Sequence, residues 1–493
     1  MSPRPAPRLR DKMKKLLAAL ATTGFKLGFG FFSLATVWAT AVIKDGVLFA
    51  KDTEEEKKEL DAAQQKFWSL NTQPLSGFKH AFFTTTTKGL NLHYVTNADE
   101  TTSSPRNVAI FIHGFPDSFL LWRHILQSPE LLRKHTLIAV DLPGYGGSDS
   151  LPAYGANEML ETMTDFILGM RNQFLHKDSK LVVVTHDWGA IVGARLAAEA
   201  SVLADRWIIT SAFIPSLTAS NAAAAWSVAR QMFHTWLQTP LHWRLLKNAV
   251  EALHPVRSQF RRSFYIFCFH LPWPFSNFFA TFGNYWFLRL LHSLGKGKPQ
   301  RNEKLLDRLT PKESGEAMAT STGPGASQLS DHEGKSMIKY GESVRLRVHD
   351  RGMAEKIRIY REGLFLGKWE KSLETTAALF DLAQASSNSN ASSSLVGGLS
   401  DGALRAPTTL ILGERDPAFE QKLGLNNVKN FLPGSSQVVV IKDAGHWLPV
   451  EPAGRRVLEK TVLWALAPSS ETESDKATEL FAEMSDVRVI VQT

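Results

Sequence analysis

Cysteine is nearly absent from this chain of 493 residues. Cys268 stands alone, so no disulfide can form within the chain and its stability must come from a buried core. Cys268 lies in an aromatic run, where we expect the thiol to pack as a small apolar side chain. Hydrophobic residues make up 44% of the chain, which is enough for one large core with insertions.

Motifs for nucleotide cofactors are also missing. No G-x-G-x-x-G follows an apolar strand and no P-loop is present, so we expect no cofactor and no metal. The formal net charge is +8, but six basic residues fall within the first 15 positions. No basic helix interleaved with aromatic residues follows them, so nucleic-acid binding is a poor interpretation.

A wholly uncharged run lies near the N-terminus, between Lys26 and Lys44. Its 17 residues approach the shortest helix that spans a bilayer, and residues 16–25 extend it if Lys26 reaches the membrane surface. We therefore expect residues 16–50 to be a single-pass membrane anchor, with the endoplasmic reticulum as the expected membrane. A cleaved signal peptide is the alternative, because Ala39-Thr40-Ala41 fits a cleavage site.

The basic tail at residues 1–15 bears on the orientation of this anchor. Basic residues concentrate before the apolar run, which favours a cytoplasmic N-terminus and places the rest of the chain across the membrane. The side on which the rest of the chain lies stays an open question at this point.

Strands and helices alternate after a charged segment. Residues 51–77 are expected to form a solvated spacer that is partly helical, and the alternation of residues 78–95 around Lys88-Gly89 predicts a β-hairpin. Buried strands are then predicted at residues 107–112, 136–141, 180–185, 206–211, 408–413 and 437–441, and helices at residues 122–133, 156–173, 190–200 and 454–466. This order predicts an α/β fold with a mostly parallel, doubly wound sheet covered on both faces.

The alternation stops after Pro215 and resumes only at Pro407. We expect residues 216–406 to be a helical lid, or cap, inserted into a single sheet fold. The two parts of that fold are then residues 78–215 and residues 407–468.

Two patches of low complexity interrupt the lid. Residues 296–336 are charged and rich in Gly and Ser, and residues 385–400 are rich in Ser and Asn. Both are predicted to be disordered surface loops. The second patch contains Asn390-Ala391-Ser392, an acceptor triplet for N-glycosylation. The polar tail at residues 469–493, which ends in VRVIVQT, has no functional interpretation.

The stretch at residues 181–193 reads LVVVTHDWGAIVG. A buried strand ends, the chain turns sharply and a helix of small residues begins, with Asp187 at the turn. Such a carboxylate lies beside the free N–H groups of a helix start, which favour negative charge. An isolated H-D-W-G fits a helix N-cap equally well. The position between strand and helix favours a nucleophile elbow, with Asp187 in place of the usual Ser.

Two further motifs follow later strands. Asp416 ends Gly413-Glu414-Arg415-Asp416, and His446 lies in Asp443-Ala444-Gly445-His446-Trp447. An isolated Asp or His at a strand end is usually a surface residue. Here Asp187, Asp416 and His446 follow the order nucleophile, acid, base. The carboxyl ends of parallel strands meet at one edge, where such sheets bind ligands.

The segment His113-Gly114-Phe115-Pro116-Asp117 comes directly after the first buried strand. With the motifs above and the order of the strands, it resembles the α/β-hydrolase fold, and within that fold the epoxide hydrolases, over residues 78–466 outside the low-complexity patches. The resemblance implies that the backbone N–H groups of Phe115 and Trp188 form an oxyanion hole. The residues that it implies for the substrate pocket are His113, Pro116, His186 and Trp447.

One position of the elbow departs from the family. The family usually has Gly two residues before the nucleophile, where this chain has Thr185. Close packing at the elbow means that a larger residue there could distort the turn.

Asp as nucleophile restricts the chemistry. A carboxylate that attacks an ester would form a labile anhydride, whereas attack on a saturated carbon gives a stable ester that is hydrolysed at the enzyme's own carbonyl. His446, oriented by Asp416, would take the proton of the attacking water. The Asp187 elbow therefore favours epoxide opening or dehalogenation over ester hydrolysis.

The lid distinguishes these two reactions. By resemblance, Tyr265 and Tyr360 hydrogen-bond the epoxide oxygen, although a Tyr in an aromatic stretch is more often a core residue. His270 stands where the family commonly has Gln. A dehalogenase would hold the halide with ring or amide N–H groups and often lacks this pair of Tyr residues.

The sequence as a whole indicates a membrane-anchored epoxide hydrolase that adds water to a small lipophilic epoxide, with membrane lipid as a second partner. The alternatives are a haloalkane or haloacid dehalogenase, an esterase, and a non-catalytic binding protein that keeps the hydrolase pocket.

Overall fold

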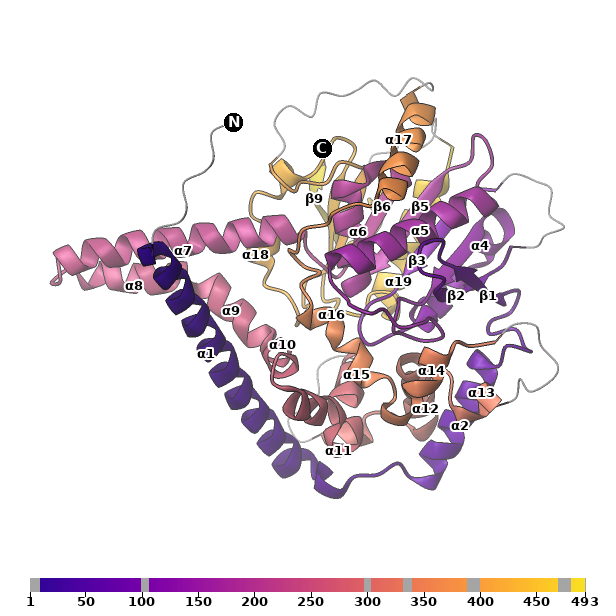
Figure 1. The fold of residues 1–493 in the computed structure, drawn as a ribbon, viewed down its shortest axis with the longest axis horizontal. Helices are drawn as coiled ribbons and strands as arrows, with labels where there is room; N and C mark the ends of the chain where they lie inside the picture. The colour runs from indigo at the N-terminus through magenta and orange to yellow at the C-terminus, as the bar shows by residue number, and fades with distance from the viewer. Residues whose placement is uncertain are drawn as a thin grey trace.

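The structure is a computed structural model of the chain. It describes residues 9–98, 106–296, 303–330, 339–387, 400–468 and 480–492. Within these residues, nine strands form one sheet in the order β1-β2-β4-β3-β5-β6-β7-β8-β9. Helices lie on both faces of this sheet, and a second, helical layer covers one of its edges (Figure 1).

The centre of the described sheet is parallel and almost completely buried. Its strands are β4 (Thr136–Val140), β3 (Val108–Ile112), β5 (Leu181–His186), β6 (Arg206–Thr210), β7 (Thr408–Gly413) and β8 (Gln437–Ile441). Each predicted strand agrees with its observed counterpart to within one residue at either end. Runs of apolar, mostly β-branched residues are typical of parallel strands buried on both faces, and the predicted α/β fold is confirmed.

Antiparallel strands close both sides of the sheet. The predicted hairpin is β1 (Lys79–Thr84) and β2 (Asn91–Thr96), of which β2 pairs with β4. At the other side β9 (Val487–Gln492), formed by the C-terminal VRVIVQT run, pairs with β8. This run therefore covers a sheet edge that would otherwise expose unpaired backbone groups.

The helices that pack on the sheet agree with the predicted pattern except at one place. They are α3 (Arg123–Leu126), α4 (Pro129–Lys134), α5 (Ala156–Phe174), α6 (Trp188–Glu199) and α19 (Pro452–Leu466). The single helix predicted at residues 122–133 is two short helices. Pro129 cannot donate a hydrogen bond to the preceding turn, and Ser128 caps the new helix by accepting from the Leu131 N–H.

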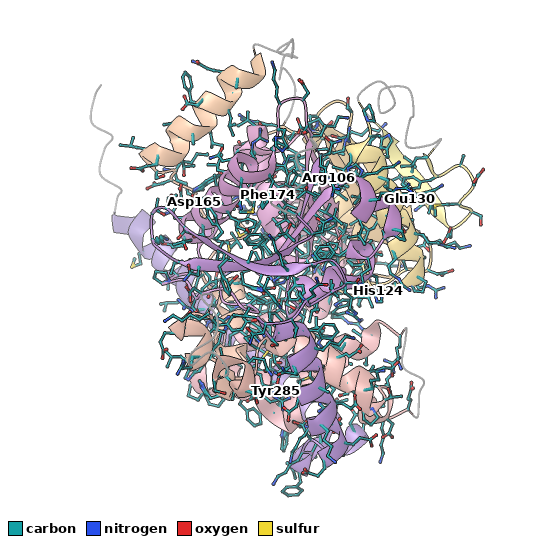
Figure 2. The ribbon with its side chains drawn as sticks, turned by 90° about the vertical axis from the view of Figure 1, so that its right-hand side faces the viewer. Arg106, His124, Glu130, Asp165, Phe174 and Tyr285 are labelled. Atoms are coloured by element: carbon teal, nitrogen blue, oxygen red, sulfur yellow. The ribbon has the colours of Figure 1, made fainter. Side chains whose placement is uncertain are left out.

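The residues between β6 and β7 form the cap. Its helices are α7 (Pro215–Gln238), α8 (Trp243–Ala252), α9 (His254–Arg262), α10 (Phe264–Phe269), α11 (Trp273–Leu294), α12 (Pro311–Thr322), α13 (Ala326–Ser330), α14 (Glu342–Leu346), α15 (Met353–Lys356), α16 (Arg358–Arg361) and α17 (Leu373–Ser387). In Figure 2 Tyr285 of α11 lies in the lower, cap layer, whereas Asp165 and Phe174 of α5 lie above it beside the sheet. Helices α7 and α8 project sideways as a hairpin (Figure 1).

Two segments differ from their predicted states because they pack on each other. Residues 311–322 of the first low-complexity patch form helix α12, which starts with a capping box at Thr310 and Glu313. It contacts α2 (Glu54–Trp68), which lies in the expected solvated spacer. Trp68 is fully buried there and its indole N–H donates to the Ala319 carbonyl at 3.0 Å. The composition of each segment alone favours exposure to solvent. A stripe of small residues on α12 nevertheless lets the two helices approach closely.

Two ion pairs also join the cap to the segment at residues 51–77, which we expected to be a solvated spacer. The buried guanidinium of Arg289 in α11 lies 2.5 Å from a carboxylate oxygen of Asp52 and 2.7 Å from one of Glu56. The rest of the first patch, residues 297–302 and 331–336, lies outside the described residues. So does most of the second patch, residues 388–399, with the Asn390-Ala391-Ser392 triplet.

The predicted anchor is a helix that contacts the cap. Helix α1 (Leu9–Thr40) continues into a π-helical turn at Ala41–Asp45. Among the described helices, only Leu20–Asp45 is long and apolar enough to cross a membrane, a property that signal sequences and buried core helices share. It packs against α10 so closely that a Cβ on Gly30 would lie 2.8 Å from the Phe267 carbonyl oxygen.

Replacing Gly315 by Ala should destabilise the α2–α12 contact. A Cβ there would lie 2.6 Å from the Glu59 carbonyl carbon and 2.8 Å from the Leu60 nitrogen, both backbone atoms that cannot move aside cheaply. We expect Gly315→Ala to lower the free energy of unfolding by about 1–3 kcal/mol, measured by denaturant unfolding in detergent. Gly28→Ala is the matched control, because that helical Gly has open space around it. Equal stability of the two variants would contradict the tight contact.

Candidate active site

Asp187 lies at the turn between β5 and α6 in a conformation that non-glycine residues rarely adopt, with φ of 52° and ψ of −118°. Such a conformation costs roughly 1–3 kcal/mol and persists only where the surroundings enforce it. Gly114 leaves room for the Asp187 side chain in this conformation, because a Cβ at position 114 would lie 2.5 Å from a carboxylate oxygen of Asp187. The elbow therefore depends on a glycine in the neighbouring loop after β3.

Thr185 fits the elbow without distorting it. A Cβ on Gly193 in α6 would lie 2.8 Å from the Thr185 methyl group, so the helix supplies the space that the larger side chain needs. The Thr185 hydroxyl donates to the Ile208 carbonyl in β6 at 3.2 Å. The departure from the family pattern is thus compensated eight residues further along the chain, in α6.

Asp187, Asp416 and His446 meet at the carboxyl edge of the sheet. Nδ1 of His446 lies 2.8 Å from Oδ2 of Asp416, and Nε2 lies 3.4 Å from Oδ2 of Asp187. All three side chains are buried, with 6–8% of each residue exposed. The imidazole therefore stands between two carboxylates.

These contacts shift the pKa values of His446 and Asp187. Burial alone would lower the pKa of His446, but the charge of Asp416 and the hydrogen bonds to both carboxylates outweigh burial and raise it to about 10. Burial acts to raise the pKa of Asp187, but the hydrogen bond and positive charge of His446 outweigh it, so this pKa is lowered. At neutral pH the site holds an imidazolium between two carboxylates.

Two backbone N–H groups converge on Asp187. The Phe115 N–H donates to its Oδ1 at 2.8 Å, and the N–H of Trp188 is a further donor to the same carboxylate. These are the two groups that the resemblance implies for an oxyanion hole. They would stabilise negative charge developing on the Asp187 carboxyl group itself.

Tyr265 on α10 and Tyr360 on α16 lie together across the cavity from the sheet. Their ring centroids are 5.8 Å apart, and a hydrogen bond joins the two side chains. The Tyr360 ring also packs edge-on against Trp188 at 4.8 Å and Phe115 at 5.1 Å. Burial raises the pKa of both tyrosines, so both carry an O–H donor at neutral pH.

One cavity of about 290 Å³ connects these groups. Asp187, His446, Tyr265 and Tyr360 line it, together with Phe115 and Trp447. The remaining wall is mostly apolar and comes largely from α11, through Phe287, Leu290, Leu291 and Leu294. Among the residues that the structure describes, no group of three or more His, Cys, Asp or Glu side chains is placed to hold a metal ion.

Sequence comparison assigns the family. A family model described as the alpha/beta hydrolase family matches residues 109–459, well over half of the chain. The chain belongs to this family.

Individual relatives match a shorter part of the hydrolase. Epoxide hydrolase 3 of Xenopus tropicalis is 30% identical over 142 residues, which are 28% of this chain and 35% of that protein. A haloalkane dehalogenase of Sphingobium indicum is 35% identical over 106 residues, which are 22% of this chain and 33% of that protein. The chain therefore matches about a third of the length of these relatives.

A solved structure supports the fold of the hydrolase. The juvenile hormone epoxide hydrolase of the silkworm Bombyx mori aligns with a TM-score of 0.51, over 88% of this chain and 89% of that chain. The sequence identity is 16%, so this likeness concerns the fold alone.

Three residues that we expected to line the pocket of the hydrolase lie behind it. His113, Pro116 and His186 are buried and do not border the cavity, whereas Trp447 does. Nε2 of His113 accepts from the Leu142 N–H at 2.9 Å, and the His186 ring donates to the His446 carbonyl at 2.9 Å. Backbone groups engage both rings, so these histidines support loops instead of facing substrate.

Sequence reasoning missed the residues that hold the loops of Asp416 and His446 in place. Arg262 of α9 donates to the Asp416 carbonyl at 3.0 Å. The Glu451 carboxylate accepts from the N–H groups of Gly445 and Trp447, which flank His446. Arg262 lies two residues before the aromatic run with Tyr265, and nothing near it signals its partner Asp416, 154 residues later. Glu451 lies only four and six residues after its partners, but nothing in its position before α19 signals those contacts.

Gly193→Ala should destabilise the hydrolase by about 1–3 kcal/mol, because the new methyl group overlaps the Thr185 side chain. Thr185→Ala removes the two Thr185 atoms that lie closest to this methyl group. In the double variant we therefore expect a coupling energy of about 1 kcal/mol or more, measured as a double-mutant cycle of unfolding free energies. Effects of the two substitutions that add to within about 0.5 kcal/mol would contradict the compensation.

The pH dependence of stability should report on His446. Its pKa is about 10 in the folded hydrolase against 6.5 for the ordinary value, so its stabilising contribution is complete below about pH 6.5 and is lost as pH rises toward 10. We expect the Tm difference between the wild type and His446→Gln to be constant at acidic pH and to shrink between pH 7 and 10. His349→Gln, at an exposed position, is the control. A difference that persists unchanged at pH 10 would contradict the raised pKa.

Proposed function

We propose that the protein is an epoxide hydrolase that converts a lipophilic epoxide to a vicinal diol through a covalent ester on Asp187. The observation that carries the proposal is the pair of protonated tyrosines that share one cavity with Asp187 and His446. An epoxide needs a nucleophile on carbon and an acid on oxygen at the same time, and this cavity offers both. The similarity to named epoxide hydrolases supports the same reading.

In the first step an Asp187 oxygen attacks an epoxide carbon and the carbon–oxygen bond of the ring breaks. The lowered pKa keeps Asp187 anionic for this attack. The leaving oxygen takes a proton from Tyr265 or Tyr360, so it leaves as a hydroxyl group. The tyrosinate that remains is stabilised by the hydrogen bond between the two side chains.

In the second step water hydrolyses the ester. Ester formation removes the negative charge of Asp187, which is one cause of the raised His446 pKa. The imidazolium then gives its proton to the tyrosinate, and the neutral imidazole accepts a proton from water. Hydroxide attacks the Asp187 carbonyl carbon, and Phe115 and Trp188 hold the resulting oxyanion. Collapse breaks the ester bond and His446 gives its proton to the diol oxygen. The neutral imidazole then takes the carboxyl proton of Asp187, which restores the resting imidazolium and carboxylate.

Membrane association would bring such substrates to the protein. The cavity wall is apolar, which suits a ligand that partitions into lipid. We propose that Leu20–Asp45 anchors the protein in a membrane, with the endoplasmic reticulum as its location.

Single-turnover hydrolysis of styrene oxide in H₂¹⁸O tests the mechanism. With enzyme in excess, ¹⁸O should enter the Asp187 carboxylate while the first diol carries none. Asp187→Ala should abolish diol formation. Unlabelled Asp187 after turnover, or diol formation by Asp187→Ala, would contradict the ester.

The double variant Tyr265→Phe with Tyr360→Phe tests the leaving group. General acid catalysis typically contributes about 10²–10⁴-fold, and we expect a loss of epoxide turnover in that range. Tyr285→Phe, a cap tyrosine that does not border the cavity, is the control. If the double variant still turned over epoxide at the rate of this control, the tyrosines would not be the acid. If the wild type released halide from 1-chlorohexane and left the epoxide intact, the protein would be a dehalogenase.

A further inference from the structure

The α7–α8 hairpin exposes large apolar side chains that the proposed reaction does not use. It projects from the body of the molecule at the left of Figure 1. Leu241 at its turn is 91% exposed and Trp243 is 66% exposed. The other exposed large apolar residues of the hairpin are Trp226, Val228, Phe233, Leu237 and Val250. A soluble surface rarely gathers so many, so this group marks a contact with something else.

The same region carries a net positive charge. Residues 215–262, from the start of α7 to the end of α9, contain six basic residues and one acidic residue, Glu251. The basic residues are Arg230, Arg244, Lys247, Arg257, Arg261 and Arg262. Apolar and aromatic side chains interleaved with Lys and Arg are typical of helices that lie in the interface of a bilayer with anionic lipids. Protein interfaces, by contrast, are depleted of Lys at their centres.

The hairpin is continuous with the helix that we propose as the anchor. Helix α9 contacts both α7 and α8. Its Phe260 ring packs on Phe25 of α1, with the ring centroids 5.8 Å apart. Phe25 lies within the apolar segment Leu20–Asp45. Helix α9 thus meets α1 near the N-terminal end of that segment, where a membrane helix would reach the bilayer surface.

We propose that the α7–α8 hairpin is a second membrane-contact element, which inserts Leu241, Trp243 and their apolar neighbours into the interface of a bilayer that contains anionic lipid. Arg244 and Lys247 then meet lipid head groups. The hairpin and α1 together hold the cap against the membrane. Arg261, which borders the cavity, lies on the helix that follows the hairpin.

A fluorescent probe on single cysteines tests this contact in the full chain. Cys268 is first replaced by Ala to give a background without thiols. Leu241→Cys and Leu373→Cys are then labelled with an environment-sensitive probe. Both leucines are exposed, at 91% and 85%, but Leu373 begins α17, which lies at the top of Figure 1, away from the hairpin at the left. Equal Tm values of the labelled and unlabelled proteins show that both variants fold.

Vesicles of phosphatidylcholine and phosphatidylserine give the readout. We expect the probe at position 241 to shift to shorter wavelength and to lose fluorescence when the lipids carry acyl-chain spin labels, while the probe at position 373 does neither. A probe at 241 that stays as water-exposed as the one at 373 would overturn the proposal. A blue shift without quenching would also overturn it and would indicate a second copy of the chain on this face.

Charge variants test the kind of lipid. Arg244→Gln with Lys247→Gln, in the background of the Leu241→Cys probe, should reduce quenching in vesicles that contain phosphatidylserine. Unchanged quenching would overturn the role of anionic lipid. No arm of the experiment measures epoxide turnover, so its outcome is independent of the proposed reaction.

Discussion

The buried negative charge of Asp187 is the constraint on which the rest of the site depends. Burying an unpaired carboxylate in a protein interior costs several kcal/mol of folding free energy. The backbone of Asp187 also has a strained conformation. The structure offsets both costs locally, through the Phe115 N–H at 2.8 Å, the Trp188 N–H and the imidazolium of His446. Gly114 is required because a side chain there would occupy the place of the carboxylate. The groups that stabilise the resting charge are the ones that the proposed mechanism uses later.

Contacts beside Asp187 and its neighbours also join the cap to the sheet. Tyr360 packs on Trp188, the residue next to Asp187, and Arg262 donates from α9 to the backbone of Asp416. Helix α10, which carries Tyr265, is packed in turn against α1. The cap is thus fastened to the core at the triad and to the proposed anchor on its outer side. A change in how α1 packs would therefore reach Tyr265 through a single helix.

Much of this arrangement could be predicted from the sequence, because local patterns determine it. Buried strands leave apolar runs, and motifs that follow parallel strands must meet at one edge, which brings Asp187, Asp416 and His446 together. The pairing of Tyr265 with Tyr360 needed the family resemblance, since nothing local separates them from core aromatics. The errors arose where the partner is distant. Helix α12 is ordered by α2, some 250 residues earlier, which no single segment reveals. Thr185, by contrast, is accommodated by Gly193 only eight residues later, but that contact depends on how α6 packs back on β5.

In the proposed mechanism the charge that holds the site together also controls its order of steps. While Asp187 is anionic, it helps to keep His446 protonated, so the imidazole cannot remove a proton from water before substrate has reacted. Alkylation neutralises Asp187 and leaves Asp416 as the carboxylate paired with His446. The pKa of His446 then falls, and the base becomes available only when there is an ester to hydrolyse. Hydrolysis restores the carboxylate and with it the protonated imidazole. In this mechanism the change of charge on Asp187 is sufficient to keep the two half-reactions in sequence.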